Sequence, residues 1–440
     1  MSTMFQNGEI SRRRGATSED QEFSEAAGAP SDEQTGGFRG ALARLVASPL
    51  ADYFLVLVSA GLLVVLGVFM VLSSSSVYAE ANMGNPYYFF IRQIIWLFVG
   101  IPMAWWMSRR SENFLKLSGW VVVGGAVLAE LLVLFTPLGV PPSGISDKGN
   151  RNWLYIGGQS LQPSEFAKLG LILWASGVLA NRTKTLDQPK RLFIPFVPVF
   201  AVILGLVLVG GDLGTAIIIG FIMFCLLWFA GAPIWTLLLM LACGAAGAGA
   251  MIVSAPMRMQ RVEAFLSGSS TVGSSEQPLN ALYALATGGW WGVGLGASRA
   301  KWGGLYDGAL NDYVFAVLGE ELGLLGTLTV IALFLVLGAA GLRVALKSDR
   351  VFWRLASAGV TAWLVGQACM NIAMAMKLLP VVGVPLPFIS YGGSALLADL
   401  LGVGVLLAAA RHEPRAREAL AAPGPKPEPV RVSTVLGRKG

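Results

Sequence analysis

The stretch ADYFLVLVSAGLLVVLGVFMVLS, residues 51–73, decides the fold class of this chain. It carries a single charged side chain in an apolar run that can cross a bilayer as a helix, for which about 20 residues are needed. Similar runs recur outward from it along the chain. We therefore expect an all-α membrane protein with about ten transmembrane helices, at residues 51–73, 87–108, 118–140, 163–180, 193–209, 212–230, 234–254, 313–341, 353–378 and 391–410.

The composition excludes a soluble fold. Hydrophobic residues make up 55% of the 440 residues and charged residues 13%, whereas soluble domains carry about 25% charged residues. The mean hydropathy is +0.64 and the pI is near 9.3. A net charge of +6 in a soluble protein would suggest nucleic acid. Here the Lys and Arg residues are concentrated in the polar segments between the apolar spans. We therefore expect a membrane environment and no nucleic-acid partner.

The distribution of Lys and Arg sets the expected orientation. With the N-terminus inside, most of the 32 basic residues fall in the two polar termini and in alternate loops, as the positive-inside rule requires. We therefore expect both termini in the cytoplasm and an even number of spans. The polar segments 1–48 and 412–440 are expected to be disordered tails that flank a membrane domain at 49–411.

Two long outer segments, residues 141–162 and 255–311, carry cations against this rule. An anionic substrate on the outer face would explain them, while interfacial anchoring would explain any single one. Within the second segment, residues 279–296 are apolar but rich in glycine, which favours a re-entrant or interface-lying segment over a span. The outer cations are Lys148, Arg151, Arg258, Arg261, Arg299 and Lys301.

Cysteine and histidine restrict the chemistry. The three cysteines lie in apolar runs without a CxxC spacing, and the only histidine, His412, lies near the C-terminus. This pattern indicates neither a disulfide framework nor a zinc site. It also excludes a histidine-based catalytic triad in the membrane domain. The sequence indicates no cofactor and no metal site, and it leaves a requirement for a divalent cation open.

Charged residues within the spans are expensive in lipid and usually face the bundle interior. Glu165 and Lys168 are three residues apart on one helix face and can pair, either as a structural ion pair or as the polar wall of a substrate cavity. Asp212 begins a span, where the helix dipole favours an acid. Asp312 and Glu320, with the neighbouring Glu321, place three acids along the outer half of another span.

The segment PLPFISYGGS, residues 385–394, joins the last two spans. Its prolines fix an extended backbone and its glycines allow close approach of neighbouring groups. It therefore predicts a rigid loop over the outer face, with Ser390 as a polar group.

Seven short motifs occur in order along the chain. They are GNRNW (149–153), QPSE (162–165) with Lys168, DLGT (212–215), RV (261–262), NDYVF (311–315), GEELG (319–323) and LPVVGVPLPFISYGGS (379–394). Taken together in this order, they resemble the FtsW/RodA family of shape, elongation, division and sporulation (SEDS) glycosyltransferases, over residues 50–411. Two departures stand out. Gly210 and Gly211 replace the family's usual Gln-Pro before Asp212, and the large outer loop lacks the family's usual aspartate.

The resemblance implies a peptidoglycan glycosyltransferase that polymerises lipid II on the outer face of the bacterial cytoplasmic membrane and releases undecaprenyl pyrophosphate. It also implies a class B penicillin-binding protein as partner. Overall similarity and the long tails favour a role in cell division, with other divisome proteins, at the septum. The substrate-binding residues expected from the resemblance and the charges are Arg151, Glu165, Lys168, Asp212, Arg258, Arg261, Lys301, Glu320 and Ser390.

The missing loop aspartate leaves the catalytic base open. Its position falls on Ser270 or Thr271, and neither side chain is a useful base. A carboxylate is the typical general base for a sugar hydroxyl, so Glu276 is the first substitute candidate and Asp312 the second. Two alternatives to an enzyme stay open: a lipid II flippase, and a non-catalytic scaffold that activates a penicillin-binding partner.

Overall fold

The computed structural model describes residues 48–140, 151–181, 189–254, 256–267, 276–305 and 308–421. Lys148, Ser270, Thr271, nearly all of the predicted N-terminal tail and residues 422–440 of the predicted C-terminal tail lie outside these ranges. Residues 49–421, where described, belong to one compact unit.

A helix occupies each of the predicted spans. Among the described residues, eight helices are long and apolar enough to cross a membrane. The other two predicted spans are α6, which carries the expected Glu165 and Lys168, and α7, of which residues 196–209 are an apolar helix. The helices are α3 (Ala51–Met83), α4 (Tyr88–Met107), α5 (Glu112–Phe135), α6 (Pro163–Ala180), α7 (Pro189–Val209), α8 (Leu213–Ala230), α9 (Ile234–Val253), α12 (Val314–Lys347), α13 (Val351–Ala375) and α14 (Gly393–Arg411).

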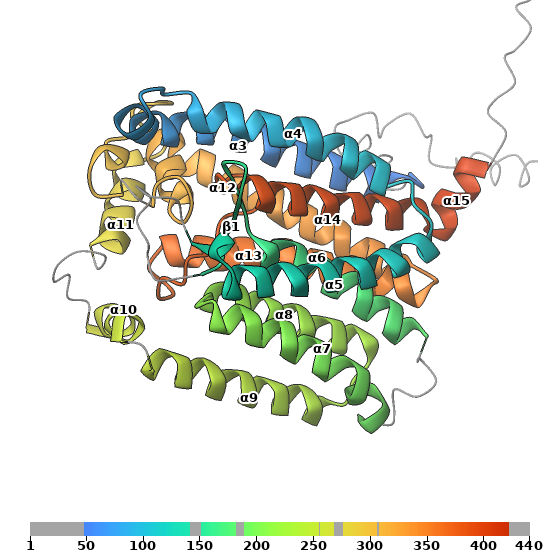
Figure 1. Cartoon of the computed structure of the whole chain (residues 1–440). Coiled ribbons are helices and arrows are strands. Elements are labelled where there is room, and N and C mark those ends of the chain that lie inside the picture. The colour runs from blue at the N-terminus through green and yellow to red at the C-terminus, as the bar shows by residue number, and fades with distance from the viewer. Residues whose placement is uncertain are drawn as a thin grey trace, which may run out of the picture. The chain divides into compact units, whose positions relative to one another are not determined.

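The core of the bundle is built around α14. This helix packs against α3, α4, α6 and α13, and its most hydrophobic window is wholly buried. Figure 1 shows α14 between α3 and α4 on one side and α5 and α6 on the other. Its sequence is rich in Gly and Ala, which let neighbouring backbones approach closely where no hydrophobic effect drives helix association in lipid.

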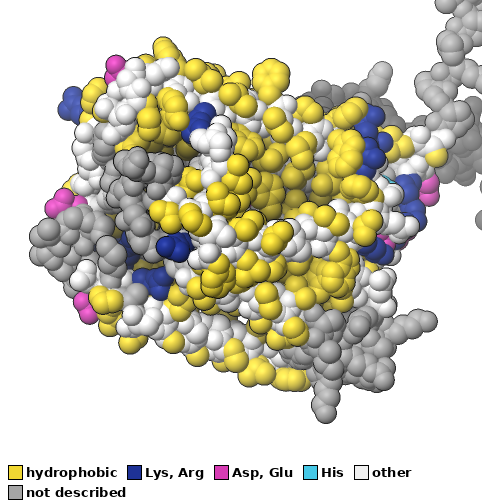
Figure 2. Space-filling model, in the orientation of Figure 1, with side chains coloured by type: hydrophobic (Ala, Val, Ile, Leu, Met, Phe, Trp, Pro, Cys, Tyr) yellow, Lys and Arg dark blue, Asp and Glu magenta, His cyan; other side chains and the backbone are white. Residues whose placement is uncertain are grey.

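The outer surface of the bundle is apolar, as a lipid-facing surface must be. Large hydrophobic side chains such as Phe98, Trp105 and Val121 are exposed on α4 and α5. Helix α9 lies at the edge of the bundle beside α8 (Figure 1) and buries little of its surface. Figure 2 shows hydrophobic side chains over the middle of the visible face, with Lys and Arg towards its ends.

Shorter elements gather at the two ends of the bundle. Helices α10 (Pro256–Ser267) and α11 (Gln277–Gly288) lie at one end, and α15 (Pro414–Ala421) at the other (Figure 1). We call the first the outer end, after the orientation that the charges predict. The remaining elements are η1 (Pro137–Gly139), η4 (Ala300–Trp302) and an antiparallel hairpin of β1 (Leu154–Ile156) and β2 (Gln159–Leu161), in which Leu154 pairs with Leu161.

Two elements differ from the expectation. Helix α15 lies in the segment expected to be disordered, and its Arg417 pairs with Asp349 at 2.8 Å, which joins it to the end of the bundle. Helix α3 continues ten residues past the expected span to Met83. Serines usually weaken helices by competing for backbone bonds. Here the Ser73 hydroxyl bonds to Glu321 and Lys301 of the outer end and not to the backbone of its own helix.

Helix α12 is broken at Gly323, whose φ of 67° is the left-handed region that favours glycine. The segment that follows α11 fills the break. Val293 and Gly294 donate to the carbonyl groups of Glu320 and Glu321, and Leu324 and Leu325 donate to those of Gly289 and Trp290. The glycine-rich run expected to be re-entrant is thus bonded into α12, and non-helical backbone at this depth is covered by protein, as lipid surroundings require.

Candidate functional site

A buried ion pair lies at the outer start of α6. Lys168 Nζ lies 2.7 Å from Glu165 Oε2, and both side chains are 1% exposed. Pro163 occupies the first turn, where its missing N–H costs nothing. The lysine also lies over the ring of Trp363, 5.1 Å from its centroid. Because both charges are buried and balance one another, loss of one is costly.

Two amides of α13 connect this pair with the outer loop at residues 379–392, which we call the cap loop. Lys168 Nζ donates to Gln367 Oε1 at 2.7 Å, and Gln367 Nε2 donates to the carbonyl of Pro385 at 3.0 Å. One turn further along α13, Asn371 Nδ2 donates to the carbonyls of Val384 at 2.7 Å and Asp312 at 3.0 Å. Neither amide was among the residues predicted from the sequence, since an amide in an apolar helix carries no motif signal.

Asp212 caps α8. Its Oδ1 accepts from the Thr215 N–H and its Oδ2 accepts from the Thr215 hydroxyl, both at 2.8 Å. Gln162 Nε2 also donates to Oδ2, at 3.0 Å, and the Gln162 N–H donates to Ser394 Oγ at 3.1 Å. The helix-terminus interpretation of this acid therefore accounts for its contacts, and the cap joins the starts of α6, α8 and α14.

The cap loop is held by Ser390 and Asp399. Ser390 Oγ accepts from the Leu386 N–H at 2.8 Å and donates to the carbonyl of Asn311 at 2.6 Å. Phe388 has a φ of 65°, which is strained for a residue with a side chain. Its N–H donates to Asp399 Oδ2 at 3.3 Å. The loop expected from the prolines is thus held by contacts to the segment before α12, to α13 and to α14.

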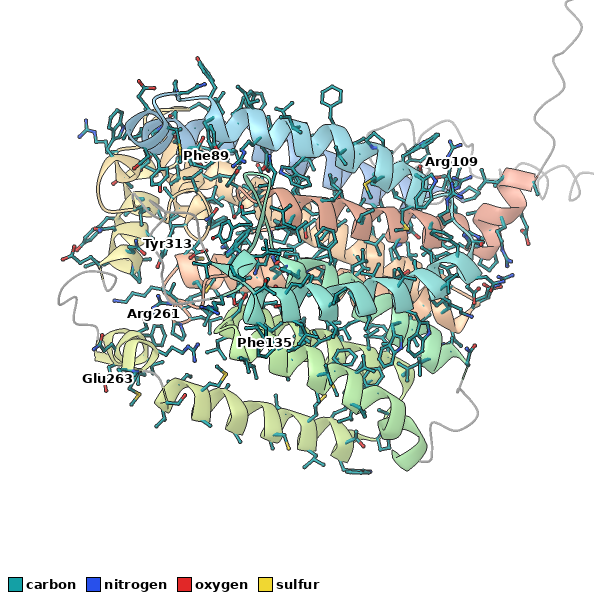
Figure 3. All side chains as sticks on the ribbon, in the orientation of Figure 1. Phe89, Arg109, Phe135, Arg261, Glu263 and Tyr313 are labelled. Atoms are coloured by element: carbon teal, nitrogen blue, oxygen red, sulfur yellow. The ribbon has the colours of Figure 1, made fainter. Side chains whose placement is uncertain are left out.

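The two candidate bases lie in different surroundings. Asp312 is half-buried beneath the cap loop, and its Oδ2 lies 3.8 Å from where a Cβ on Gly383 would be. Burial and the Asp312 carboxylate raise the pKa of the neighbouring Tyr313, and Arg261 opposes them. Figure 3 shows Arg261 on α10 and Tyr313 at the same end of the molecule. Glu276 is exposed at the start of α11 and makes no side-chain cap.

The outer arginines form a partly exposed cationic group. Arg151 is exposed and donates to the carbonyl of Leu134 at 3.2 Å. Arg258 is half-buried and donates to the carbonyls of Gly211 at 3.0 Å and Met251 at 3.4 Å. A guanidinium has five N–H donors, so both retain donors beyond these bonds. Arg261 is exposed.

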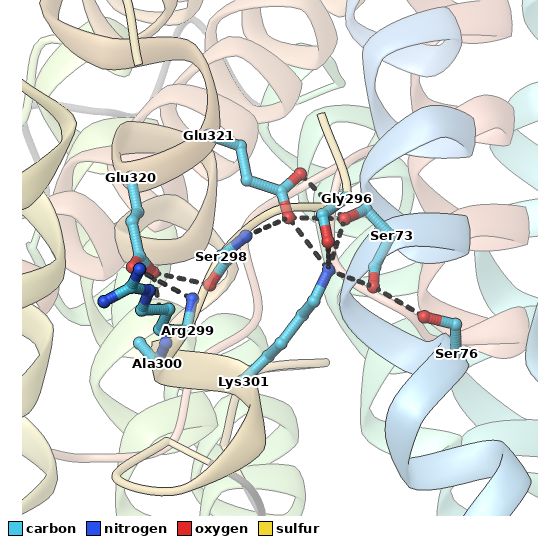
Figure 4. Close-up of polar contacts among 9 residues, drawn as sticks. All are labelled: Ser73, Ser76, Gly296, Ser298, Arg299, Ala300, Lys301, Glu320 and Glu321. Atoms are coloured by element: carbon cyan, nitrogen blue, oxygen red, sulfur yellow. Dashed lines mark hydrogen bonds and ion pairs between the residues drawn. The ribbon is translucent and has the colours of Figure 1, made fainter. Parts of the chain in front are cut away.

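Lys301 and the adjacent acids of α12 form a second polar cluster, shown in Figure 4. Lys301 Nζ lies 3.1 Å from Glu321 Oε1 and also donates to Ser73 Oγ at 3.1 Å and to the carbonyl of Gly296 at 2.7 Å. Glu320 accepts the Arg299 N–H at 3.0 Å and the Ala300 N–H at 3.2 Å. These buried groups tie the segment after α11 to α3 and α12.

The structure therefore divides the predicted site residues into three groups. Glu165, Lys168, Asp212 and Ser390 support the start of α6 and the cap loop. Lys301 and Glu320 belong to the second cluster. Arg151, Arg258, Arg261, Asp312 and Glu276 keep partly or fully exposed side chains. Among the described residues, no group of three or more His, Cys, Asp or Glu could hold a metal ion.

The fold and this site define a polytopic helical membrane protein with a polar outer end. The family model for FtsW, RodA and SpoVE, described as "Cell cycle protein", matches residues 53–415. The chain therefore belongs to the FtsW/RodA/SpoVE family of cell cycle proteins, as the sequence motifs predicted.

Individual relatives agree with this assignment. A protein of Mycobacterium tuberculosis named "Probable peptidoglycan glycosyltransferase FtsW" is 38% identical over 375 residues, which cover 85% of this chain and 70% of the relative. A chain from a structure described as "Structural coordination of polymerization and crosslinking by a peptidoglycan synthase complex" has a TM-score of 0.65 at 26% identity and covers 81% of this chain and 97% of its own. The crystal structure of Thermus thermophilus rod shape determining protein RodA has a TM-score of 0.57 at 26% identity, with coverages of 81% and 96%.

Proposed function

We propose that this chain is a peptidoglycan glycosyltransferase that polymerises lipid II on the outer face of the cytoplasmic membrane during cell division. Its family and the names of its relatives support this activity. The observation that carries it furthest is the outer end itself. There, the half-buried Asp312 lies under the cap loop and near Tyr313, whose charge environment also includes Arg261.

The chemistry fits these groups. A sugar hydroxyl attacks the anomeric carbon of a second saccharide, a carboxylate takes the hydroxyl proton, and the bond from that carbon to the pyrophosphate oxygen breaks. Undecaprenyl pyrophosphate leaves with the bonding electrons. Arginine donors suit a pyrophosphate because their planar fork binds its oxygens in pairs, and Arg151, Arg258 and Arg261 supply them. A carboxylate base contributes about 10²–10⁴-fold to such a rate.

We propose a class B penicillin-binding protein as the partner, because a structural relative comes from a complex described as coordinating polymerization and crosslinking. The proposed location is the septum, with both termini cytoplasmic and with other divisome proteins nearby. The position of the basic residues supports this orientation. Arg343 and Lys347 pair with Asp52 at the end opposite the outer arginines.

The test is glycan synthesis from labelled lipid II by the chain co-purified with its class B partner. Glu276→Gln and Asp312→Asn are compared with the unmodified complex, and Glu263→Gln, another exposed outer acid, is the matched control. We expect one of the two variants to lose strands by at least about a hundredfold and the control to keep them. Full activity in both variants would reject both bases. Absence of strands from a folded, partner-bound complex would favour the scaffold or the flippase.

A further inference from the structure

We infer that Gln367 and Asn371, two amides on α13, are positioning residues that hold the cap loop and the Asp312 backbone in the arrangement needed for glycosyl transfer. This inference rests on the proposed function. Neither side chain touches the exposed surface, since both are 0% exposed. Their action is therefore exerted through the groups that they bind.

The first observation is the bonding of the segment before α12. Three consecutive carbonyls each accept a hydrogen bond from the cap loop or α13. The carbonyl of Leu310 accepts from the Tyr391 N–H at 3.0 Å, that of Asn311 from Ser390 Oγ at 2.6 Å, and that of Asp312 from Asn371 Nδ2 at 3.0 Å. The Asp312 side chain projects from a backbone fixed in this way, so its direction depends on these donors.

The second observation is that Asn371 joins the two segments through one nitrogen. Its Nδ2 donates to Asp312 and to Val384, so the amide keeps the cap loop and the start of α12 together. Its Oδ1 has no hydrogen-bond partner in the part of the chain that the structure describes. These two donated bonds are therefore the only side-chain hydrogen bonds that Asn371 makes in the described part of the chain. Replacing its nitrogen leaves the carbonyls of Asp312 and Val384 without this donor.

The third observation is that both the oxygen and the nitrogen of the Gln367 amide are hydrogen-bonded. Its Oε1 accepts from Lys168 Nζ at 2.7 Å and from Trp363 Nε1 at 3.0 Å, which fixes the orientation of the amide. Its Nε2 is thereby directed at the carbonyl of Pro385. The buried pair of Glu165 and Lys168 is the inner support of these contacts, which reach Pro385 of the cap loop. The adjacent Val384 is joined to Asp312 by Asn371.

The substitutions Gln367→Glu and Asn371→Asp test this role because each replaces the donating nitrogen with oxygen at almost constant volume. Gln367→Glu keeps an acceptor for Lys168 and loses the bond to Pro385, while Asn371→Asp loses both donated bonds. Both also add a buried negative charge, so Gln367→Met and Asn371→Leu, which lose the donors without adding charge, are measured beside them. Cys369→Ser is the matched control, since Cys369 lies between them on α13 and is exposed.

The first measurement is hydrogen exchange of residues 308–316 and 379–392 in the full chain with its partner. We expect both variants to raise exchange in these segments by about tenfold or more, which corresponds to the net contribution of one or two hydrogen bonds, with no change in α5 or in the control. Exchange equal to that of the unmodified chain would overturn the inference, whatever the enzymatic result.

The second measurement is the rate of glycan synthesis against lipid II concentration. Because misplacement of a reacting group by about 1 Å can cost 10²-fold, we expect kcat to fall about tenfold to a hundredfold in each variant, with KM within about twofold. In an Asp312→Asn background, Asn371→Asp should lower the residual rate no further, since both act on one group. A change in KM alone, or additive losses, would contradict positioning through Asp312. Absence of activity in the unmodified complex would instead count against the proposed function and leave the exchange result to decide.

Discussion

Lys301 and Glu321 form an ion pair of 3.1 Å in which the two side chains are only 2% and 0% exposed. The lysine belongs to η4 and the acid to α12, next to the break at Gly323. Ser73 of α3 bonds to both, so three elements that are distant in sequence meet at this pair. Its burial indicates that it holds the outer segment in place.

The pair predicts a stability pattern. Lys301→Met or Glu321→Gln alone should each destabilise the protein by about 3–5 kcal/mol, because one buried charge loses its partner. The double variant should recover most of this loss, since no unpaired charge is left. Thermal unfolding in detergent measures it, with Arg299→Met, at an exposed neighbouring position, as the control. If Lys301 binds the pyrophosphate of the substrate instead of serving only as the partner of Glu321, the double variant will regain stability but will not synthesise glycan.

The close approach of α3 to the cap loop predicts a steric effect. A Cβ on Gly67 would lie 2.0 Å from the carbonyl oxygen of Phe388. Gly67→Ala should therefore lower the free energy of unfolding by about 1–3 kcal/mol, the usual range for overpacking. Gly61→Ala on the same helix meets nothing within 4 Å and serves as the control. Equal melting temperatures for the two variants would mean that the cap loop can move away from α3.

The exposed Arg261 predicts a substrate effect. Arg261→Gln should raise the KM for lipid II about tenfold, because a charge-assisted hydrogen bond contributes about 1.5–3 kcal/mol. The effect should shrink at high salt, since the site is open to solvent. Arg350→Gln, at the opposite end beside Glu112, should leave KM unchanged. An unaltered KM in Arg261→Gln would remove this arginine from the proposed pyrophosphate contacts.

The start of α15 predicts a pH effect. Burial, followed by the charge of Asp52, raises the pKa of Glu413 to about 7, while Lys347 and Arg343 oppose them. A carboxyl whose folded pKa lies above its unfolded value favours the folded state when protonated. Its contribution is therefore complete below about pH 4.5 and is lost as the pH rises through about 7.

Hydrogen exchange of α15 across this range measures the effect. Protection should fall by about 1–3 kcal/mol between pH 5 and pH 8, and Glu413→Gln should abolish the pH dependence. Glu418→Gln, at an exposed position on the same helix, should retain it. Protection that rises with pH would show that the basic residues dominate at Glu413.

The sequence alone determined the fold class and the family. An apolar run of bilayer length is stable in lipid as a helix that satisfies its own backbone, so the existence and order of the spans from residue 51 onward could be predicted. Their ends were less certain, and α3 runs ten residues past its predicted span. Motifs such as QPSE and GEELG, in their order, identified the family. The spacing of Glu165 and Lys168 predicted their pairing, because it depends only on helix geometry.

Only the tertiary structure decided which polar residues support the site and which are free to act. Lys301 and Arg261 are both outer cations in the sequence, yet one is buried against Glu321 and the other is exposed. The break in α12 is filled by backbone bonds from a segment that is distant in sequence, as between Val293 and Glu320, which are 27 residues apart. Gln367 and Asn371 gain their role from carbonyls of other segments, and such contacts arise from packing and leave no local pattern in the sequence.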